Sequence, residues 1–284
     1  MFDLMNRAKE AIESFDVGLR VHSNNTAHAN TPGYKRHKYT FKTIFNQVLQ
    51  NARQSSGPNQ GTRNPFQVGS SIAVSDIEID FSQGDIVDGS ALDLAVLGEG
   101  LFIISGMAEG DKLYTRAGNF MVDASGAYIT TTDGNGLYGY KTDSSGNPDT
   151  SELVPIKTDN YGDLGWQDGG ILVANFKANQ DDPTIATIPL YQVALTSFAN
   201  KGGLLSIEGT RFQEQVSSGK PYAPILPSTG SMGDIYAQRR EKSNVEYVTE
   251  SIQSLEAQRA LNASLTTLKM ASDQIQNVVN KLGG

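Results

Sequence analysis

Three histidines, His22, His28 and His37, are the side chains here that could bind a transition metal or move a proton near neutral pH. His22 and His28 lie six residues apart, whereas two metal ligands on one helix face lie three or four apart. The chain has no cysteine, and no carboxylates cluster beside the histidines. We therefore expect the histidines to cap or pack, and we expect no metal site and no cofactor.

Acidic residues offer two further candidates for chemistry. The pair Asp181-Asp182 could be imagined as an acid and a base, and the stretch Asp159–Asp163 as a calcium loop. The loop lacks the glutamate that an EF-hand carries at its twelfth position, and both stretches are typical of solvated turns. No Gly-x-Ser-x-Gly motif is present to expose a nucleophilic serine. We expect no catalytic residue and no enzymatic activity.

The segment 134–139 matches the bare Gly-x-Gly-x-x-Gly pattern of dinucleotide-binding proteins. That site needs a strand before the glycines and a helix that opens at the last one, so that the helix N-terminus faces the pyrophosphate. Here Tyr140, Lys141, Thr142 and Asp143 lead into another turn. These glycines are interpreted as turn residues.

The composition points to a folded, turn-rich protein without a nucleic-acid partner. Its 284 residues are 38% hydrophobic, include 29 glycines and carry a net charge of −8. Phosphate recognition needs a basic face, which this balance does not favour. No run of 18 apolar residues exists, so no membrane span is expected. The first residues lack the apolar segment of a cleaved signal peptide, so any export would leave the N-terminus in place.

The charge is unevenly spread along the chain. Residues 1–40 carry six basic and four acidic groups, whereas residues 41–240 carry thirteen and twenty-two. An acidic middle between near-neutral ends indicates that the middle of the chain is exposed to solvent and that the two ends of the chain pack against other surfaces.

The last forty-odd residues, 243–284, predict one long amphipathic helix. Ser243 stands at an N-cap position and Glu246 completes a capping-box spacing. A helix of this length, about 60 Å at 1.5 Å per residue, needs a partner surface. Its apolar residues recur in steps of three and four. They are Val245, Val248, Ile252, Leu255, Leu261, Leu265, Leu268, Ile275, Val279 and Leu282.

The N-terminal segment predicts a second amphipathic helix, which could pack on its own domain as an ordinary surface helix. Because such helices stand at both ends of the chain, we instead expect them to pair as a coiled-coil-like inner domain. The apolar stripe of this first helix is formed by Leu4, Ala8, Ile12, Phe15 and Leu19.

Between the two helices the sequence predicts a mainly β body. Residues 24–36 form a specified polar corner around Pro32 and Gly33, residues 41–50 fit a short amphipathic helix, and residues 51–64 are a polar loop. Alternating apolar residues and short apolar runs predict strands from about residue 68 to 216, with hairpin turns at 123–126 and 133–136. We divide the chain into terminal helices (1–30 and 241–284), a corner with an extended segment (31–75) and a β-rich outer body (76–235).

Several motifs, in this order, resemble the bacterial flagellar axial family, which comprises the rod and hook proteins. The corner carries the family signature at Asn24, Asn25, Asn30, Thr31, Pro32, Gly33, Tyr34 and Lys35, and differs from the family at His28. Further motifs are Phe81–Asp85, Leu92–Phe102, Tyr114–Phe120, Val122–Gly126, Ser243–Val245 and Ala257–Ala260. The resemblance covers residues 1–140 and 190–284, and the polar segment 51–64 is most like the distal rod member.

The resemblance implies a structural subunit that polymerises into a helical tube, transmits torque and passes export substrates. It implies export through the type III apparatus without cleavage, and a location in the flagellar basal body across the periplasm. The implied partners are other copies of the chain, neighbouring rod and hook proteins, the export apparatus and the bushing rings around the rod. The two apolar stripes would form the inter-subunit packing surface, and the corner residues would lie between the tube and the outer body.

Two alternatives stay open at this point. The chain could be a proximal rod or short hook subunit of the same family. In a different class, it could be a self-contained β-rich binding module or adhesin that its helices merely dimerise.

Overall fold

The computed structural model describes residues 2–43, 46–50, 66–69, 71–106, 110–143, 145–159 and 161–282. The chain divides into two compact units. We call the first, formed by residues 1–26, 37–78 and 246–284, the helical unit, and the second, formed by residues 27–36 and 79–245, the β unit. Each unit therefore contains segments that are far apart in the sequence.

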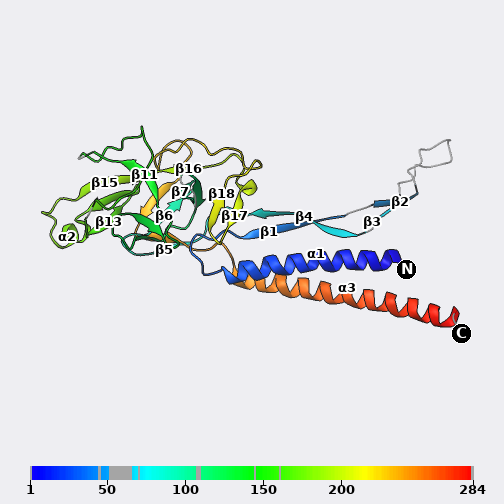
Figure 1. Cartoon of the computed structure of the whole chain (residues 1–284). Coiled ribbons are helices and arrows are strands. Elements are labelled where there is room, and N and C mark those ends of the chain that lie inside the picture. The colour runs from blue at the N-terminus through cyan, green and yellow to red at the C-terminus, as the bar shows by residue number, and fades with distance from the viewer. Residues whose placement is uncertain are drawn as a thin grey trace, which may run out of the picture. The chain divides into compact units, whose positions relative to one another are not determined.

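The helical unit is built on two long helices, α1 (Phe2–Ala27) and α3 (Tyr247–Leu282). They run side by side in opposite directions (Figure 1), and His22 near the end of α1 contacts Glu250 near the start of α3. The unit also holds a two-stranded pairing of β1 (His37–Thr43) with β4 (Ile72–Ile79), and one of β2 (Asn46–Gln50) with β3 (Phe66–Gly69). The chain is thus mainly β with one long helix at each end.

The helix expected over residues 41–50 is wrong, because the structure has strands β1 and β2 there. The apolar spacing fits a helical period, but aromatic and β-branched residues such as Tyr39, Thr40 and Phe41 favour strands. Pairing with β3 and β4 decides the outcome, since short segments are set by their partners more than by propensity. Ile44, Phe45 and the polar stretch 51–64 lie outside the described residues.

The start of the last helix also differs from the prediction. α3 begins at Tyr247, where the Glu250 backbone N–H donates to the Glu246 carbonyl over 3.0 Å. The Ser243 hydroxyl instead accepts a hydrogen bond from the backbone N–H of Val245 (3.2 Å). Ser243 therefore shapes the approach to the helix and does not cap it.

The β unit contains two five-stranded antiparallel sheets. The first has the order β16-β7-β8-β18-β17 and the second the order β12-β11-β15-β14-β13. The strands of the first are β7 (Leu101–Ser105), β8 (Lys112–Thr115), β16 (Leu195–Thr196), β17 (Leu205–Ile207) and β18 (Arg211–Gln213). The strands of the second are β11 (Tyr138–Lys141), β12 (Val154–Pro155), β13 (Leu164–Gln167), β14 (Ile171–Ala174) and β15 (Ile188–Val193).

Three two-stranded pairings complete the β unit. They are β5 (Ile86–Asp88) with β20 (Arg239–Glu241), β6 (Leu94–Leu97) with β19 (Asp234–Ala237), and β9 (Phe120–Val122) with β10 (Ile129–Thr131). Two short helices are α2 (Phe176–Asp181) and η1 (Lys201–Gly203). The antiparallel pairs β5–β20 and β6–β19 hold the segment that leads into α3 against the first strands of the unit.

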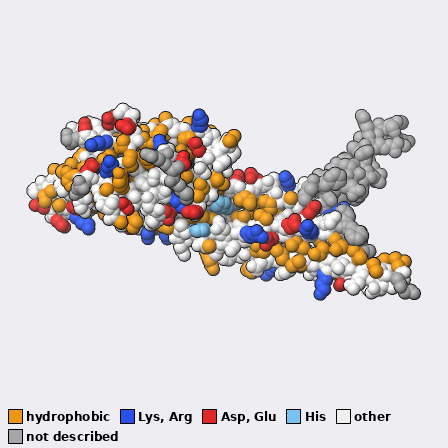
Figure 2. All heavy atoms as spheres, viewed as in Figure 1, with side chains coloured by type: hydrophobic (Ala, Val, Ile, Leu, Met, Phe, Trp, Pro, Cys, Tyr) orange, Lys and Arg blue, Asp and Glu red, His pale blue; other side chains and the backbone are white. Residues whose placement is uncertain are grey.

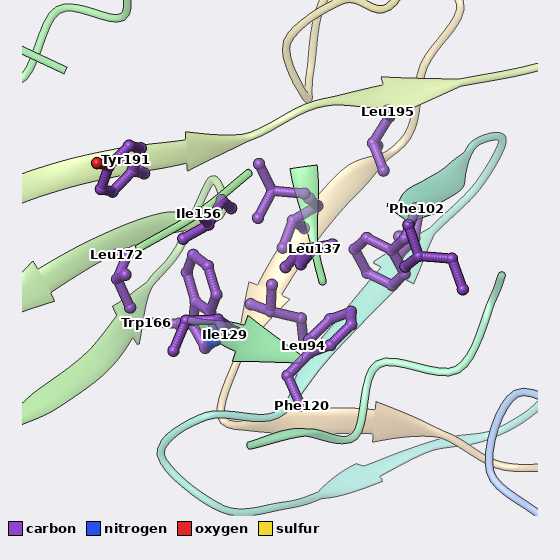
Figure 3. Close-up of a cluster of buried hydrophobic side chains, with 14 of the residues drawn as sticks. Leu94, Phe102, Phe120, Ile129, Leu137, Ile156, Trp166, Leu172, Tyr191 and Leu195 are labelled. Atoms are coloured by element: carbon purple, nitrogen blue, oxygen red, sulfur yellow. The ribbon is translucent and has the colours of Figure 1, made fainter. Parts of the chain in front are cut away.

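The core of the β unit joins both five-stranded sheets. Trp166 of β13 and Phe102 of β7 are completely buried in one apolar cluster, and Figure 3 shows the labelled side chains converging from several strands. The apolar runs predicted as strands are therefore confirmed as core strands. The predicted turns are confirmed as well, since Gly126 and Gly134 have φ of 71° and 82° and each closes a backbone hydrogen bond of its turn.

Candidate functional site: a buried motif junction and a helical packing surface

Glu241, the last residue of β20, is the centre of a buried ionic cluster in the β unit, which we call the motif junction. Its side chain is fully buried. Oε1 accepts hydrogen bonds from Lys35 Nζ and from the backbone N–H of Gly84, both over 2.7 Å, and Oε2 accepts one from Arg116 Nε over 2.6 Å. One carboxylate thus binds three parts of the chain that lie more than 30 residues apart.

Arg116 uses its remaining N–H groups on backbone carbonyls. It donates to the carbonyls of Gly100, Val96 (2.8 Å) and Gly98 (2.7 Å), and to Gln83 Oε1 over 2.9 Å. A planar guanidinium with five donors suits such a site, because a buried cation needs every donor satisfied. Arg116 therefore fixes the loop between β6 and β7.

Lys35 is the second buried cation of the junction. Its ammonium also donates to the Ser82 carbonyl over 2.8 Å. Burial lowers the pKa of Lys35 below its usual value, the facing Glu241 carboxylate opposes this, and the nearby Arg116 adds to the lowering. Two cations share one carboxylate here, so backbone carbonyls must stabilise the excess positive charge.

The junction leaves no space for a substrate. A cavity beside Lys35 and Arg116 has a volume of about 10 Å³, about what a single water molecule needs. The charged groups are engaged with one another and with the backbone. The arrangement can fasten segments together, and it has no room to carry out chemistry.

The corner motif supplies one wall of the junction. The Gly33 backbone N–H donates to the Glu241 carbonyl over 2.9 Å, and Gly33 has a φ of +68°. A Cβ at this position would lie 2.4 Å from the backbone nitrogen of Ala117, so only glycine fits. Tyr34 is buried and its ring stacks on His28, with 4.7 Å between centroids. His28, the residue that departs from the family motif, therefore has a packing role.

Two asparagines brace the backbone around the corner. In the helical unit, the Asn25 side chain bonds both backbone groups of His37, at 2.9 and 3.0 Å. In the β unit, Asn244 Oδ1 accepts from the Arg36 backbone N–H over 2.8 Å, and its amide donates to the carbonyl of Asp80 over 2.8 Å. Asn24 and Asn30 are exposed, Thr31 contacts His28 through its hydroxyl, and Pro32 is half-buried.

Sequence reasoning missed Glu241 and Arg116 as site residues. Arg116 lies inside the family-like motif Tyr114–Phe120. A cationic residue between the small residues Thr115 and Ala117 is the signal that could have identified it as a site residue. Glu241 is one of 31 acidic residues and carries no local signal of burial. Only the antiparallel pairing of β5 with β20 places its carboxylate beside Lys35 and Arg116.

The helical unit contains the two predicted apolar stripes. Eight of the less exposed residues of α3 recur in steps of four and three, which is a heptad pattern. They are Glu250, Ser254, Ala257, Leu261, Ser264, Leu268, Ala271 and Ile275. Four of these eight side chains are alanine or serine, and the buried ones are Glu250, Ala257 and Ala271. The face of α3 that turns toward its own unit therefore buries little apolar surface.

Many of the predicted packing residues are instead exposed. On α1, Ala8 is buried, Leu4 is exposed, and Ile12, Phe15 and Leu19 are half-buried. On α3, Leu261, Leu268 and Ile275 are half-buried. Val245, which precedes α3, is buried. The other predicted residues within α3 are exposed, namely Val248, Ile252, Leu255, Leu265, Val279 and Leu282. Figure 2 shows hydrophobic side chains gathered along α3 toward its C-terminal end.

One buried polar contact joins the two helices. His22 Nδ1 lies 2.6 Å from Glu250 Oε2, and His22 Nε2 lies 3.1 Å from the hydroxyl of Tyr39 on β1. Burial, together with the Glu250 carboxylate, raises the pKa of Tyr39. This contact fixes the alignment of α1 against α3, because a shift of either helix would separate a buried histidine from a buried carboxylate.

The described residues contain no cluster of three or more histidine and carboxylate side chains placed to hold a metal ion. Within that same part of the chain, no helix combines the length and the apolar character needed to cross a membrane. Tyr138–Lys141 form strand β11, so no helix follows the glycines of 134–139.

Comparison with known proteins gives consistent matches. A family model described as the flagellar hook protein FlgE/F/G D1 domain matches residues 95–176. The flagellar basal-body rod protein FlgG of Bacillus subtilis is 28% identical over 271 residues, which is 95% of both chains. FlgG of Agrobacterium fabrum is 28% identical over 96% of this chain and 97% of its own. The flagellar hook protein FlgE of Helicobacter pylori is 33% identical over 54% of this chain but only 21% of its own.

Proposed function

Because this chain belongs to the flagellar rod and hook family, we propose that it is a distal-rod-type subunit that polymerises into a helical tube. It is a structural protein of the flagellar basal body and not an enzyme. The tube transmits torque and lets export substrates pass along its axis. The rod relatives match from end to end, and this full-length correspondence is the observation that carries the proposal.

The lengths of the matches support a rod subunit more than a hook subunit. The chain and the rod relatives each cover about 95% of the other, whereas the match to the hook protein covers a fifth of that protein. A hook subunit of that kind would need a much longer middle than the β unit provides. The rod assignment is therefore favoured, and a short hook subunit stays the second candidate because the hook match has the higher identity.

The helical unit supports assembly through α1 and α3. Exposed apolar side chains such as Val248, Ile252 and Val279 stand on α3 without cover in the single chain, which is typical of an interaction surface. We propose that α1 and α3 pair as a coiled-coil-like element and form the inner wall of the tube. The two predicted stripes then form the inter-subunit packing surface, and the corner residues 24–35 connect the tube to the outer body.

The export route and the partners follow from this assignment. We propose that the chain leaves the cytoplasm through the type III apparatus with its N-terminus intact and assembles across the periplasm. Its neighbours are then other copies, adjacent rod and hook proteins, and the rings that surround the rod. A self-contained adhesin would not need the exposed apolar side chains that α3 carries outside its inward-facing residues.

Imaging of basal bodies tests this function directly. In a strain that lacks the chain, the axial structure is expected to stop within the rod, before any hook forms. Restoring the gene is expected to restore both rod and hook. A complete rod with only the hook missing would assign the chain to the hook, and normal basal bodies would reject the axial role.

A further inference from the structure

An apolar groove lies on the helical unit, where α1, α3 and the start of β4 meet. Its volume is about 410 Å³, and it is shallow and open to the surface. Leu4, Ala8 and Ala11 of α1 form one wall, Ile72 of β4 forms another, and Ser264 and Thr267 of α3 close the third side. Arg7 contributes a positive charge to the wall.

An exposed apolar ridge lies elsewhere on the same unit. Val248, Ile252 and Leu255 of α3 are 62%, 52% and 53% exposed, although all three are aliphatic. They are spaced by four and three residues and so form one line on the helix surface. The groove and the ridge are both apolar, one concave and the other convex.

The ridge cannot fill the groove of its own chain. The ridge is centred near residue 252 and the α3 wall of the groove near residue 265, a separation of about 20 Å along the helix at 1.5 Å per residue. The contact of His22 with Glu250 fixes this alignment. Any molecule that brings the two features together must therefore be a second copy.

The charged residue that lines the groove and the charged residues that flank the ridge have opposite signs. Glu246 and Glu256 flank the ridge and are exposed, and the segment 246–258 contains no lysine or arginine. Arg7 stands in the wall of the groove. Opposite charges at the edge of an apolar contact set its register and orientation.

We propose that the ridge Val248–Ile252–Leu255 of one copy occupies the groove of the next copy, displaced by about 20 Å along the helix axis. This contact deepens the proposed function and rests on it, since it names the surfaces through which copies meet. The two surfaces differ, so the contact is heterologous, and a pair of copies joined by it leaves one groove and one ridge open. Repetition of such a contact builds an open filament and not a closed dimer.

Because the chain has no cysteine, paired cysteines can report the contact without background. A double variant, Ala11→Cys with Ile252→Cys, places one thiol in the groove and one on the ridge. Within one chain the two positions are about 14 Å apart along the helices, judged from the register of His22 and Glu250, and a disulfide needs Cα atoms within about 7 Å. Oxidation of polymer is expected to give a ladder of covalent multimers, and oxidation of dilute monomer is expected to give none.

The matched control pairs Ala11→Cys with Gln253→Cys. Gln253 is exposed and adjacent to Ile252, but it points about 100° away around the helix. This control is expected to polymerise and to form few covalent multimers. Equal ladders from both double variants would overturn the proposed contact.

A substitution provides a second, independent readout. Ile252→Asp on the exposed ridge is expected to leave the circular dichroism of the monomer unchanged and to reduce polymer mass more than about tenfold. Gln253→Asp is expected to leave polymerisation intact. If polymer forms but Ile252→Asp has no effect, or the cysteine pair yields no ladder, the contact is wrong and the structural function stands. If the unchanged chain never extends purified rod or hook seeds, the proposed function and this contact both fail.

Discussion

The motif junction shows how residues with no chemistry of their own can hold distant segments of the chain together. Lys35, Arg116 and Glu241 are buried and come from three distant segments, and the Glu241 carboxylate accepts hydrogen bonds from both cations. A buried ionic cluster contributes little net stability compared with apolar packing, but removal of one member is costly. These residues therefore specify one arrangement of the corner, the β6–β7 loop and the approach to α3.

Replacement of Glu241 tests the junction. Glu241→Gln keeps the shape of the side chain but leaves two buried cations without an anion, so the free energy of unfolding is expected to fall by about 3–5 kcal/mol. Urea unfolding followed by tryptophan fluorescence measures this, since Trp166 is buried in the core of the same unit. The exposed Glu152→Gln is the control, and its effect is expected to stay below about 0.5 kcal/mol. If Glu241→Gln and the unchanged chain have the same free energy of unfolding, the junction does not stabilise the fold.

Buried tyrosines predict how the β unit responds to alkali. Burial raises the pKa of Tyr114 to about 12, with the Glu214 carboxylate as a second cause. The unfolded chain loses this proton near pH 10, so it binds fewer protons than the folded chain between pH 10 and 12. The stability contributed by Tyr114 is present below pH 10 and is lost as pH rises through that window.

Between pH 10 and 12 the unfolding free energy of Tyr114→Phe is therefore expected to decrease by roughly 2 kcal/mol less than that of the unchanged chain. Urea titrations at several pH values measure the slope, and ultraviolet absorbance of tyrosinate follows the ionisation. The exposed Tyr222→Phe serves as control. An unchanged slope in Tyr114→Phe would contradict a raised pKa at this site.

At the scale of elements, the sequence predicts the strands of the core and the two long helices well, because the core strands are short apolar runs and the helices carry apolar residues in steps of three and four. It fails at residues 41–50, where helical and strand periodicities compete over a short run and the partner strands decide. It also identifies the apolar stripe of α3 but not which side turns inward. Leu261 and Leu268 are half-buried on the inward seam, half of which is alanine and serine, while Val248 and Leu255 lie outside that seam and are exposed.

A charged substitution on the exposed side of α3 tests assembly without disturbing the folding of the β unit. Leu265 is 43% exposed, so Leu265→Asp is expected to leave the β unit folded, with unchanged urea unfolding of its core. Burial of an unpaired carboxylate between copies costs several kcal/mol, so incorporation into the rod is expected to fall more than about tenfold. Swimming assays and immunoblots of basal bodies measure this. The neighbouring exposed residue supplies the matched control Thr266→Asp, and full motility of Leu265→Asp would remove this side of α3 from the packing surface.

At the scale of the whole molecule, the two units differ in how much each buries. The β unit has a continuous apolar core built from both five-stranded sheets. In α3, which has 36 residues, the buried side chains are Glu250, Ala257 and Ala271, of which none is a large apolar residue. A long helix that buries little has a low free energy of local opening, since most helical stability in proteins comes from packing of an apolar face.

This difference predicts that assembly, and not folding of the single chain, supplies the stability of the helices. In dilute monomer, the amides of residues 1–25 and 245–284 are expected to exchange with deuterium fast, while those of β7, β8 and β13–β15 stay protected. In polymer, the helical segments are expected to gain protection by more than about a hundredfold, because neighbouring copies cover the exposed side chains of α3. Hydrogen exchange read by mass spectrometry on both states measures this. Helices already protected in dilute monomer would mean that each chain shelters its own ends, and a role for α3 as the packing surface between copies would then lose its physical basis.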